Sequence, residues 1–262
     1  MQLNIKKTQP IIEKEASIYN GTITIQLGEF GRKKHAYYWV EKDYFIPGVT
    51  STLGILDKPA LIPWAASMAS GYIQDNLPEN ADKSQIAEVC KKAKTHYRDF
   101  TDKAADIGTE VHLYAQNLFK GEPIQVPDNS LVINGVQALH TWLNENQVQP
   151  IDVEQIVFSK SAFFAGMVDL LAGVNGKLSL VDFKTGKDIY REHRIQTAGA
   201  YRFAWEEEHQ EQIEQVIIVN TNKLTGIPKI EIIDDPSELQ LYADIFLRTK
   251  SLNDLLKKLG DY

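Results

Sequence analysis

Residues 166–186 read GMVDLLAGVNGKLSLVDFKTG, which is two apolar stretches separated by Asn175-Gly176. Asn-Gly between apolar runs is the strongest short-range signal of a β-hairpin, because both residues tolerate the positive φ of a type I′ turn. A two-residue turn also sets the pairing register, and this register places Asp169 opposite Asp182. The stretch therefore predicts an antiparallel hairpin with two facing carboxylates.

Three charged groups share one face of this hairpin. Lys184 follows Asp182 by two residues, so its side chain points to the same side as the aspartates. Like charges directly opposite each other are destabilising, and ionised carboxylates in an apolar setting need a metal or matched partners. An alternative is a surface ion pair in which Lys184 neutralises one aspartate on a solvent-facing sheet.

Apolar residues on both faces of the hairpin favour a covered sheet over that alternative. One face carries Val168, Leu170, Val181 and Phe183, and the charged face also carries Met167, Leu171, Leu178 and Leu180. The pattern therefore predicts that the hairpin holds a cation.

The composition is that of a soluble globular protein. The chain has 262 residues, of which 43% are hydrophobic and 24% charged, and this suits one large domain. No apolar run could span a bilayer, and residues 1–7 lack the apolar region of a signal peptide. The single cysteine, Cys90, excludes internal disulfides and a cysteine-ligated iron–sulfur cluster. These features indicate a cytoplasmic protein with no membrane partner.

The formal net charge of −7 argues against a general role in coating DNA, since phosphate binding needs positive charge. The charge is uneven along the chain, however. Acidic residues concentrate at 206–214, whereas basic residues concentrate at 91–103 and at 187–194. A local basic groove on an acidic protein is therefore compatible with the sequence.

The periodicity predicts a single domain over 1–262 that has four parts. These are N-terminal strands at 1–58, a helical insert at 59–150, an α/β core at 151–235 and a C-terminal helix at 236–262. Within the insert we expect helices at 59–76, 84–120 (with a break near Gly108) and 130–146, the last capped by Asn129 or Ser130.

In the core we expect a strand at 152–160, a helix at 190–209 and strands at 213–222 and 226–233. The final helix is predicted to be capped by Ser237. We expect it to bury one apolar stripe made of Leu239, Leu241, Ile245, Leu252, Leu255 and Leu256.

Four motifs follow one another in order, namely the G-x-x-x-H of 108–112, the GMVD of 166–169, the VDFKTG of 181–186 and the QTAGAY of 196–201. In this order they resemble the RecB-like exonuclease branch of the PD-(D/E)XK nuclease superfamily. The block IPGVTSTL at 46–53, followed by Trp64-Ala65, is similar to phage-type members and to mitochondrial genome maintenance exonucleases. The core motifs cover about residues 105–205.

The resemblance implies a fold and a chemistry. The fold is α/β, with a restriction-endonuclease-like mixed β-sheet core flanked by helices, a helical insertion and an N-terminal β-hairpin. The activity is hydrolysis of DNA phosphodiester bonds with one or two Mg²⁺ or Mn²⁺ ions. The implied catalytic residues are Asp169, Asp182, Lys184 and Gln196. The implied metal ligands are His112, Asp169, Asp182 and the backbone carbonyl of Phe183.

Further contacts with DNA are expected from Thr50, Ser51, Thr52, Tyr201 and Arg194. The sequence departs from the motif at Tyr201, because it lies five residues after Gln196, and the strict Q-x-x-x-Y position is Ala200. The chain has no nucleotide-binding loop, so a helicase or recombination partner would be a separate protein. The expected setting is a bacterial or phage-infected host cell, in DNA repair, recombination or phage genome processing.

Several alternatives stay open at this point. Glu154 could bind a second metal, but a solvated strand end is the favoured interpretation. The leading hypothesis for the whole chain is an exonuclease that acts on single strands or duplex ends, with the insert at 59–146 arching over the site. The competing hypotheses are a structure-selective endonuclease, a catalytically decayed nucleic-acid-binding module and a metal protein that does not cleave nucleic acid.

Overall fold

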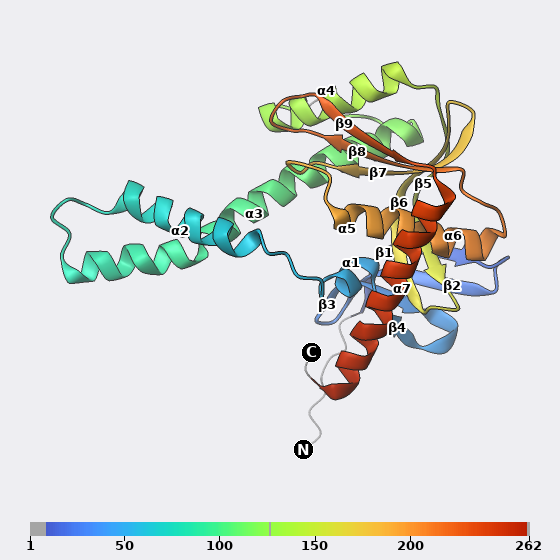
Figure 1. The fold of residues 1–262 in the computed structure, drawn as a ribbon, viewed down its shortest axis with the longest axis horizontal. Coiled ribbons are helices and arrows are strands. Elements are labelled where there is room, and N and C mark those ends of the chain that lie inside the picture. The colour runs from blue at the N-terminus through green and yellow to red at the C-terminus, as the bar shows by residue number, and fades with distance from the viewer. Residues whose placement is uncertain (1–8, 126, 261–262) are drawn as a thin grey trace.

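The computed structural model describes residues 9–125 and 127–260, so the prediction about residues 1–7 lies outside the described part. Two β-sheets and a set of helices form the molecule, and a helical arm extends from its body (Figure 1). In the described ranges, no helix combines the length and apolar character needed to cross a membrane.

A five-stranded sheet with the order β5-β6-β7-β8-β9 is the centre of the fold. Its strands are β5 (Val148–Ser159), β6 (Phe164–Val174), β7 (Lys177–Lys184), β8 (Gln215–Thr221) and β9 (Pro228–Ile233). β7 and β8 are parallel and all other neighbours are antiparallel. A parallel pair needs a long crossover, which the helices between β7 and β8 provide.

Helices cover both faces of this sheet, as the apolar residues of the hairpin require. One face packs against the end of α3 (Lys83–Lys120) and α4 (Ser130–Glu145), and the core there includes Trp142 and Phe183. The other face packs against the crossover and α7 (Pro236–Leu259). The crossover consists of α5 (Arg191–Arg194), the π-helical segment η2 (Ile195–Tyr201) and α6 (Arg202–His209). This arrangement confirms the predicted mixed α/β core.

The N-terminal part forms more than the predicted hairpin. A second, four-stranded antiparallel sheet has the order β1-β2-β3-β4, and the short helices η1 (Val40–Lys42) and α1 (Val49–Leu53) accompany it. Its strands are β1 (Ile11–Ile18), β2 (Ile23–Phe30), β3 (Lys33–Trp39) and β4 (Tyr44–Ile46). Its apolar face packs on Ile156, Phe158 and Ala165 of the central sheet. Short, twisted strands of this kind bury a core only as a group.

The predicted insert forms an arm rather than a lid. Helix α2 (Leu61–Asn76) and the first half of α3 run side by side and project sideways from the body (Figure 1). Helix α2 has no buried residue, because its only extensive helical neighbour is α3. The expectation that the whole insert arches over the centre is therefore wrong for its distal part.

Three local predictions are also corrected. Helix α3 runs without a break through Gly108, since its core-facing residues Ile107 and Val111 hold the helix on both sides of the glycine. The N-cap of α7 is Asp235, whose carboxylate accepts from the backbone N–H of Ser237 and of Glu238.

The buried stripe of α7 also differs from the predicted one. Leu239, Ala243 and Phe246 are buried, whereas Leu241, Leu252 and Leu255 are more than half exposed. The chain beyond Phe246 buries polar residues instead, namely Thr249, Lys250 and Asn253.

Candidate active site

The hairpin forms as its turn residues require. Asn175 has φ 51° and Gly176 has φ 83°, and the ladder runs in the predicted register from Val174–Lys177 to Leu170–Val181. The ladder ends there, so the strands part at the next position, where Asp169 and Asp182 lie. The sequence analysis placed Val168 on the same face as Leu170. In the structure Val168 lies on the opposite face, where it packs with Leu171 against the crossover helices. The pairing therefore opens at the two acids.

Asp182 is the most buried charged group of the site, with a residue exposure of 2%. Burial raises the pKa of its carboxyl above the ordinary value, the charge of Asp169 raises it further, and Lys184 acts in the opposite direction. The Lys184 Nζ lies 2.6 Å from Asp182 Oδ2. This lysine supplies the positive charge that a buried carboxylate needs to stay ionised.

Asp169 lies between the hairpin and helix α3. Its Oδ2 accepts a hydrogen bond from the backbone N–H of Phe183 at 2.8 Å and lies 3.5 Å from Nδ1 of His112. The structure thus brings His112, Asp169, Asp182 and Lys184 to the end of β7, as predicted. The side chain of Phe183 is in the core, so only its main chain can face the site.

Asp169 borders two hollows. The larger is a cleft of about 470 Å³ between the N-terminal sheet, α1 and β6, and its lining includes Lys33, His35, Thr50 and Tyr201. The smaller, of about 10 Å³, lies on the α3 side, and its polar lining residues are His112, Gln116, Glu154 and Asp169. The second hollow is the size of one water molecule or ion.

Glu154 is therefore part of the site, and its interpretation as a solvated strand end is wrong. It lies inside β5 with φ 56°, at the position opposite Asp169 between the pairs Val153–Leu170 and Gln155–Val168. The pairing register continues unbroken on both sides of Glu154, so this is a local left-handed backbone and not an inserted residue. The sequence carried no signal for this conformation, because glutamate is not a typical left-handed residue.

Gln196 and Tyr201 meet although their spacing departs from the motif. Both lie in η2, whose π-helical winding brings residues five apart onto one side, and Gln196 Nε2 donates to Tyr201 Oη at 2.5 Å. Tyr201 is buried, and this burial raises its pKa well above the ordinary value, so the phenol stays protonated. The extra residue of the motif is absorbed by the π-turn.

Two glycines of the motifs allow close approaches around the site. A Cβ on Gly108 would lie 2.8 Å from Thr185 Oγ1, so this glycine lets α3 approach the end of β7. A Cβ on Gly166 would lie 2.3 Å from Cε1 of Tyr201, so the tyrosine ring packs directly on the β6 backbone.

The predicted DNA contacts divide into two groups. Thr50 and Ser51 are exposed on α1 and line the larger cleft, although the Ser51 hydroxyl donates to the Gly48 carbonyl. Thr52 is fully buried and its hydroxyl donates to the same carbonyl, so it cannot contact DNA. Arg194 makes a two-pronged ion pair with Glu231, which neutralises its charge. Thr52 and Arg194 are therefore removed from the set. Tyr201 lines the larger cleft, but it is buried and its hydroxyl is bonded to Gln196, so it stays an expected contact only through that lining position.

Asn220 is a neighbour of the site that the sequence analysis missed. It pairs with Lys184 across the parallel β7–β8 ladder and is fully buried, yet neither side-chain polar atom has a hydrogen-bond partner among the described residues. Buried amides without partners are rare and mark functional or hydrated places. The sequence offered no signal, since the parallel pairing joins segments separated by the whole crossover.

The residues present suit a divalent cation by their chemistry. No three His, Cys, Asp or Glu side chains in residues 9–125 and 127–260 are already arranged around one point as metal ligands. In this structure Lys184 compensates Asp182, and the Phe183 N–H and His112 face Asp169. Two carboxylates, an imidazole and a backbone carbonyl are nevertheless suitable ligands for a divalent cation. Mn²⁺ can use the oxygen atoms and the imidazole nitrogen, whereas Mg²⁺ would use the oxygen atoms.

His193, near the site on α5, gives a pH prediction. Burial lowers its pKa to about 4, and the charge of Lys184 acts in the same direction. Since an unfolded histidine titrates near 6.5, the unfolded state takes up the proton first. Neutral His193 thus contributes stability that is complete above pH 6.5 and is lost as the pH falls toward 4.

Between pH 6.5 and pH 4, we expect the free energy of unfolding of His193→Asn to fall by roughly 2 kcal/mol less than that of the parent. This figure is smaller than the pKa difference alone would give, because the ring is partly exposed to solvent. The asparagine oxygen can replace Nδ1, which accepts from the Tyr190 N–H at 3.2 Å. Denaturant unfolding at pH 4, 5, 6.5 and 7.5 measures the difference. Identical slopes of stability against pH for the variant and the parent would contradict the prediction.

The fold and the site together define a mixed α/β protein with a buried carboxylate–lysine pair at the end of its central hairpin. No protein-family model matches the chain, and no curated protein matches it. Among solved structures, the chain is similar to an alkaline exonuclease (LHK-Exo) from Laribacter hongkongensis, with 13% identity and a TM-score of 0.30. That match covers 76% of this chain and 98% of the other.

A structure of LHK-Exo in complex with dAMP matches with 13% identity and a TM-score of 0.29, over 75% of this chain and 96% of the other. Likeness at this level does not establish a function. The function is therefore argued from the site itself.

Proposed function

We propose that the protein is a Mg²⁺- or Mn²⁺-dependent DNA exonuclease that acts on single strands or on duplex ends. The observation that supports this most is the meeting of Asp169, Asp182, Lys184 and His112 at the end of β7. Tyr201, which accepts a hydrogen bond from Gln196, lines the larger cleft together with Asp169. These residues come from four separate motifs of the chain, and carboxylates with a nearby cation are the groups that metal-assisted hydrolysis of a phosphodiester uses.

Asp169, Asp182, His112 and the carbonyl of Phe183 would hold the metal. When bound, the metal lowers the pKa of a coordinated water and polarises the scissile phosphate. Lys184 is placed to orient the attacking water and to stabilise charge that develops on the phosphate oxygens. Gln196, held by Tyr201, is placed to accept or donate a hydrogen bond to that water or to the phosphate.

The larger cleft is the proposed path of the DNA strand. Lys33, Lys34 and His35 on one wall and the Thr50 hydroxyl on the other can contact phosphates, and Asp169 lies on its lining. The ammonium groups of Lys33 and Lys34 support binding of an anionic substrate by a chain with a net charge of −7, although Lys34 Nζ also lies 3.8 Å from Glu29 Oε1.

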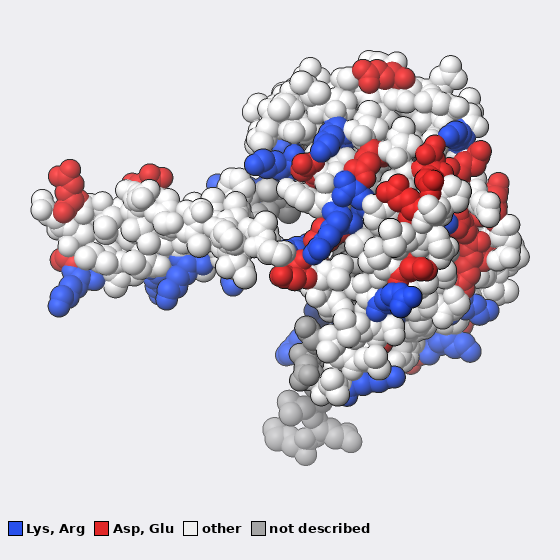
Figure 2. Space-filling model, viewed as in Figure 1, with Lys and Arg blue, Asp and Glu red and all other residues white. Residues whose placement is uncertain are grey.

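Dependence on a free end is proposed from the base of the arm. Figure 2 shows an opening between this base and the body, with lysine and arginine side chains on its body side and acidic side chains on its lower border. The connection 54–60 from α1 to α2 is tied to the body where Arg191 Nη2 donates to the Asp57 carbonyl at 2.6 Å. A closed border of this kind admits a strand by its end more readily than from the side.

Comparing the cleavage of linear and covalently closed circular single-stranded DNA distinguishes an exonuclease from an endonuclease. With MnCl₂ or MgCl₂ we expect end-labelled linear DNA to be degraded at least about a hundredfold faster than the circle, because only the linear strand has an end to insert. Product lengths on denaturing gels measure both rates, and Asp182→Asn serves as the inactive control.

Equal rates on the two substrates would replace the exonuclease with an endonuclease. Binding without cleavage of any DNA, in either metal, would support the alternative of a decayed binding module. The intact aspartates and lysine argue against that alternative, because decay of a nuclease fold removes such residues first.

A further inference from the structure

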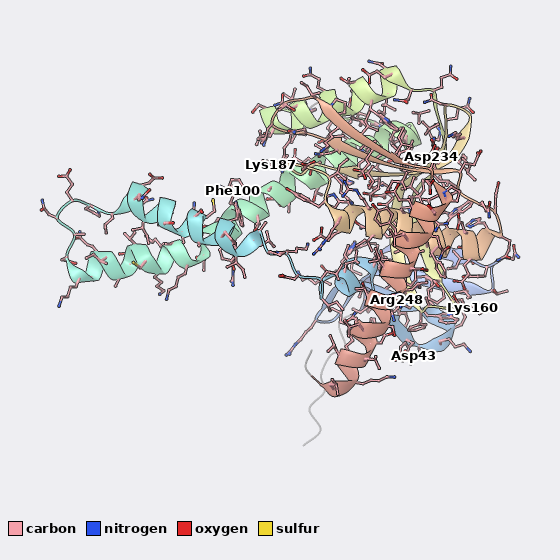
Figure 3. The ribbon with its side chains drawn as sticks, viewed as in Figure 1. Asp43, Phe100, Lys160, Lys187, Asp234 and Arg248 are labelled. Carbon is pink, nitrogen blue, oxygen red and sulfur yellow. The ribbon has the colours of Figure 1, made fainter. Side chains whose placement is uncertain are left out.

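The C-terminal helix α7 carries apolar residues on two opposite sides, the inner of which is apolar only as far as Phe246. Its inner side packs on η2 and α1 through Leu239, Ala243 and Phe246. Its outer side lies in front of the body, where Figure 3 labels Arg248. Soluble helices at a surface normally present polar residues outward, and a helix that is apolar all round is buried by a second partner.

The outer side follows a strict heptad pattern. Its residues recur at alternating spacings of four and three, and all except Arg248 are leucine or isoleucine. They are Leu241, Ile245, Arg248, Leu252, Leu255 and Leu259. The four leucines are 51–73% exposed, whereas Ile245 is half-buried at the border between the seam and the core. The seam runs from Leu241 to Leu259 within the 24-residue helix, so it is about 28 Å long.

The pattern is complementary to itself when it is reversed. In an antiparallel pair of α7 helices, Leu241 would face Leu259 of a second copy, and Ile245 would face its Leu255. Arg248 would face the second copy's Leu252 beside the two-fold axis. The acidic half of the helix then meets the basic half, because the flanking Asp244 would face Lys258 of the second copy.

We infer that α7 is a docking surface for a second copy of this chain, which forms an isologous antiparallel helix pair. The charge pattern selects this occupant, since a like helix in parallel orientation would bring Asp244 opposite Thr249 and leave the charge unmatched. The single polar seam position, Arg248, sets the register at some loss of stability. An isologous contact uses the same patch on both subunits, as the reversed repeat requires.

Sedimentation equilibrium of the full chain at 1–100 µM tests this inference. We expect the mass of two chains, and Leu252→Glu/Leu255→Glu should raise the dissociation constant by at least about a hundredfold, because charges would enter the seam. Leu224→Glu/Ile227→Glu, at leucine and isoleucine residues that are 65% and 68% exposed elsewhere, should leave it unchanged. Circular dichroism confirms that both variants fold.

A charge exchange tests the orientation. Asp244→Lys and Lys258→Asp should each weaken the dimer by about tenfold, and the double exchange should restore it to within about threefold of the parent. A monomer at every concentration overturns the proposal. A dimer that ignores the leucine substitutions, or whose double exchange is no tighter than either single one, also overturns it.

Discussion

If the protein is the proposed nuclease, Lys184→Met is expected to lower the rate of phosphodiester cleavage by about a thousandfold or more, because it removes the cation that we propose orients the attacking water and stabilises the phosphate oxygens. The ammonium lies 2.6 Å from Asp182 Oδ2 and the side chain is 18% exposed. Because the Lys184 side chain is this enclosed, water cannot take over the role of its positive charge. Initial rates on linear single-stranded DNA with saturating Mn²⁺ measure the effect.

The same substitution should also reduce stability, since Asp182 would lose its partner. Breaking a buried ion pair from one side costs about 3–5 kcal/mol, and less where the remaining acid takes up a proton. Burial already raises the pKa of Asp182, so the unpaired carboxyl will protonate more readily. The double variant Asp182→Asn/Lys184→Met removes both charges and should regain most of the stability while staying inactive.

Lys177→Met is the matched control on the same strand. Lys177 is paired with Asp234 at 3.1 Å, but both side chains are about half exposed. Exposed pairs contribute about 0–1 kcal/mol, so stability and cleavage should both stay near the parent values. If Lys184→Met kept more than a tenth of the parent rate, the assignment of this site would be wrong.

Among substitutions that add a single methyl group in the site, we expect Gly166→Ala to reduce stability and cleavage the most. The new Cβ would lie 2.3 Å from Cε1 and 2.8 Å from Cδ1 of the buried Tyr201 ring. Overpacking of this kind costs about 1–3 kcal/mol. Because Tyr201 holds Gln196, we also expect cleavage to fall by about tenfold or more. Denaturant unfolding and initial rates measure the two effects.

Gly173→Ala tests whether the effect is specific to that contact. Gly173 lies on the same strand, and its added Cβ would meet nothing nearer than atoms of Gln149 at 3.9 Å. There we expect unchanged or slightly raised stability, since alanine restricts the unfolded chain. Equal losses in both variants would show that β6 tolerates no side chain at either position and would remove Tyr201 from the explanation.

Local signals predicted the hairpin and most of the elements correctly. Asn175 and Gly176 adopt the positive φ that a tight turn needs, and this alone sets the register up to Leu170–Val181. The order of the motifs predicted that His112, Asp169, Asp182 and Lys184 would lie together, and they do. These features depend on neighbours in sequence, whose preferences can be read from residue type.

Features that depend on distant partners were missed or misplaced. The left-handed backbone of Glu154 and the position of Asn220 beside Lys184 depend on pairing with other strands. The burial of Thr52 and the ion pair of Arg194 with Glu231 follow from where other elements pack. Residue type gives no information on such partners.

The amino-acid sequence by itself determined the charged hairpin and the order of the chemical groups, because turn geometry and side-chain alternation are local properties, whereas the mixed sheet was expected only from the resemblance of the motifs. Only the tertiary structure decided how the π-turn joins Gln196 to Tyr201, where the arm projects, and which side of α7 is buried. Those outcomes depend on which apolar surfaces of distant segments pack against each other. In α7 the side that carries Leu239 and Phe246 packs on the core, so the opposite apolar stripe remains exposed.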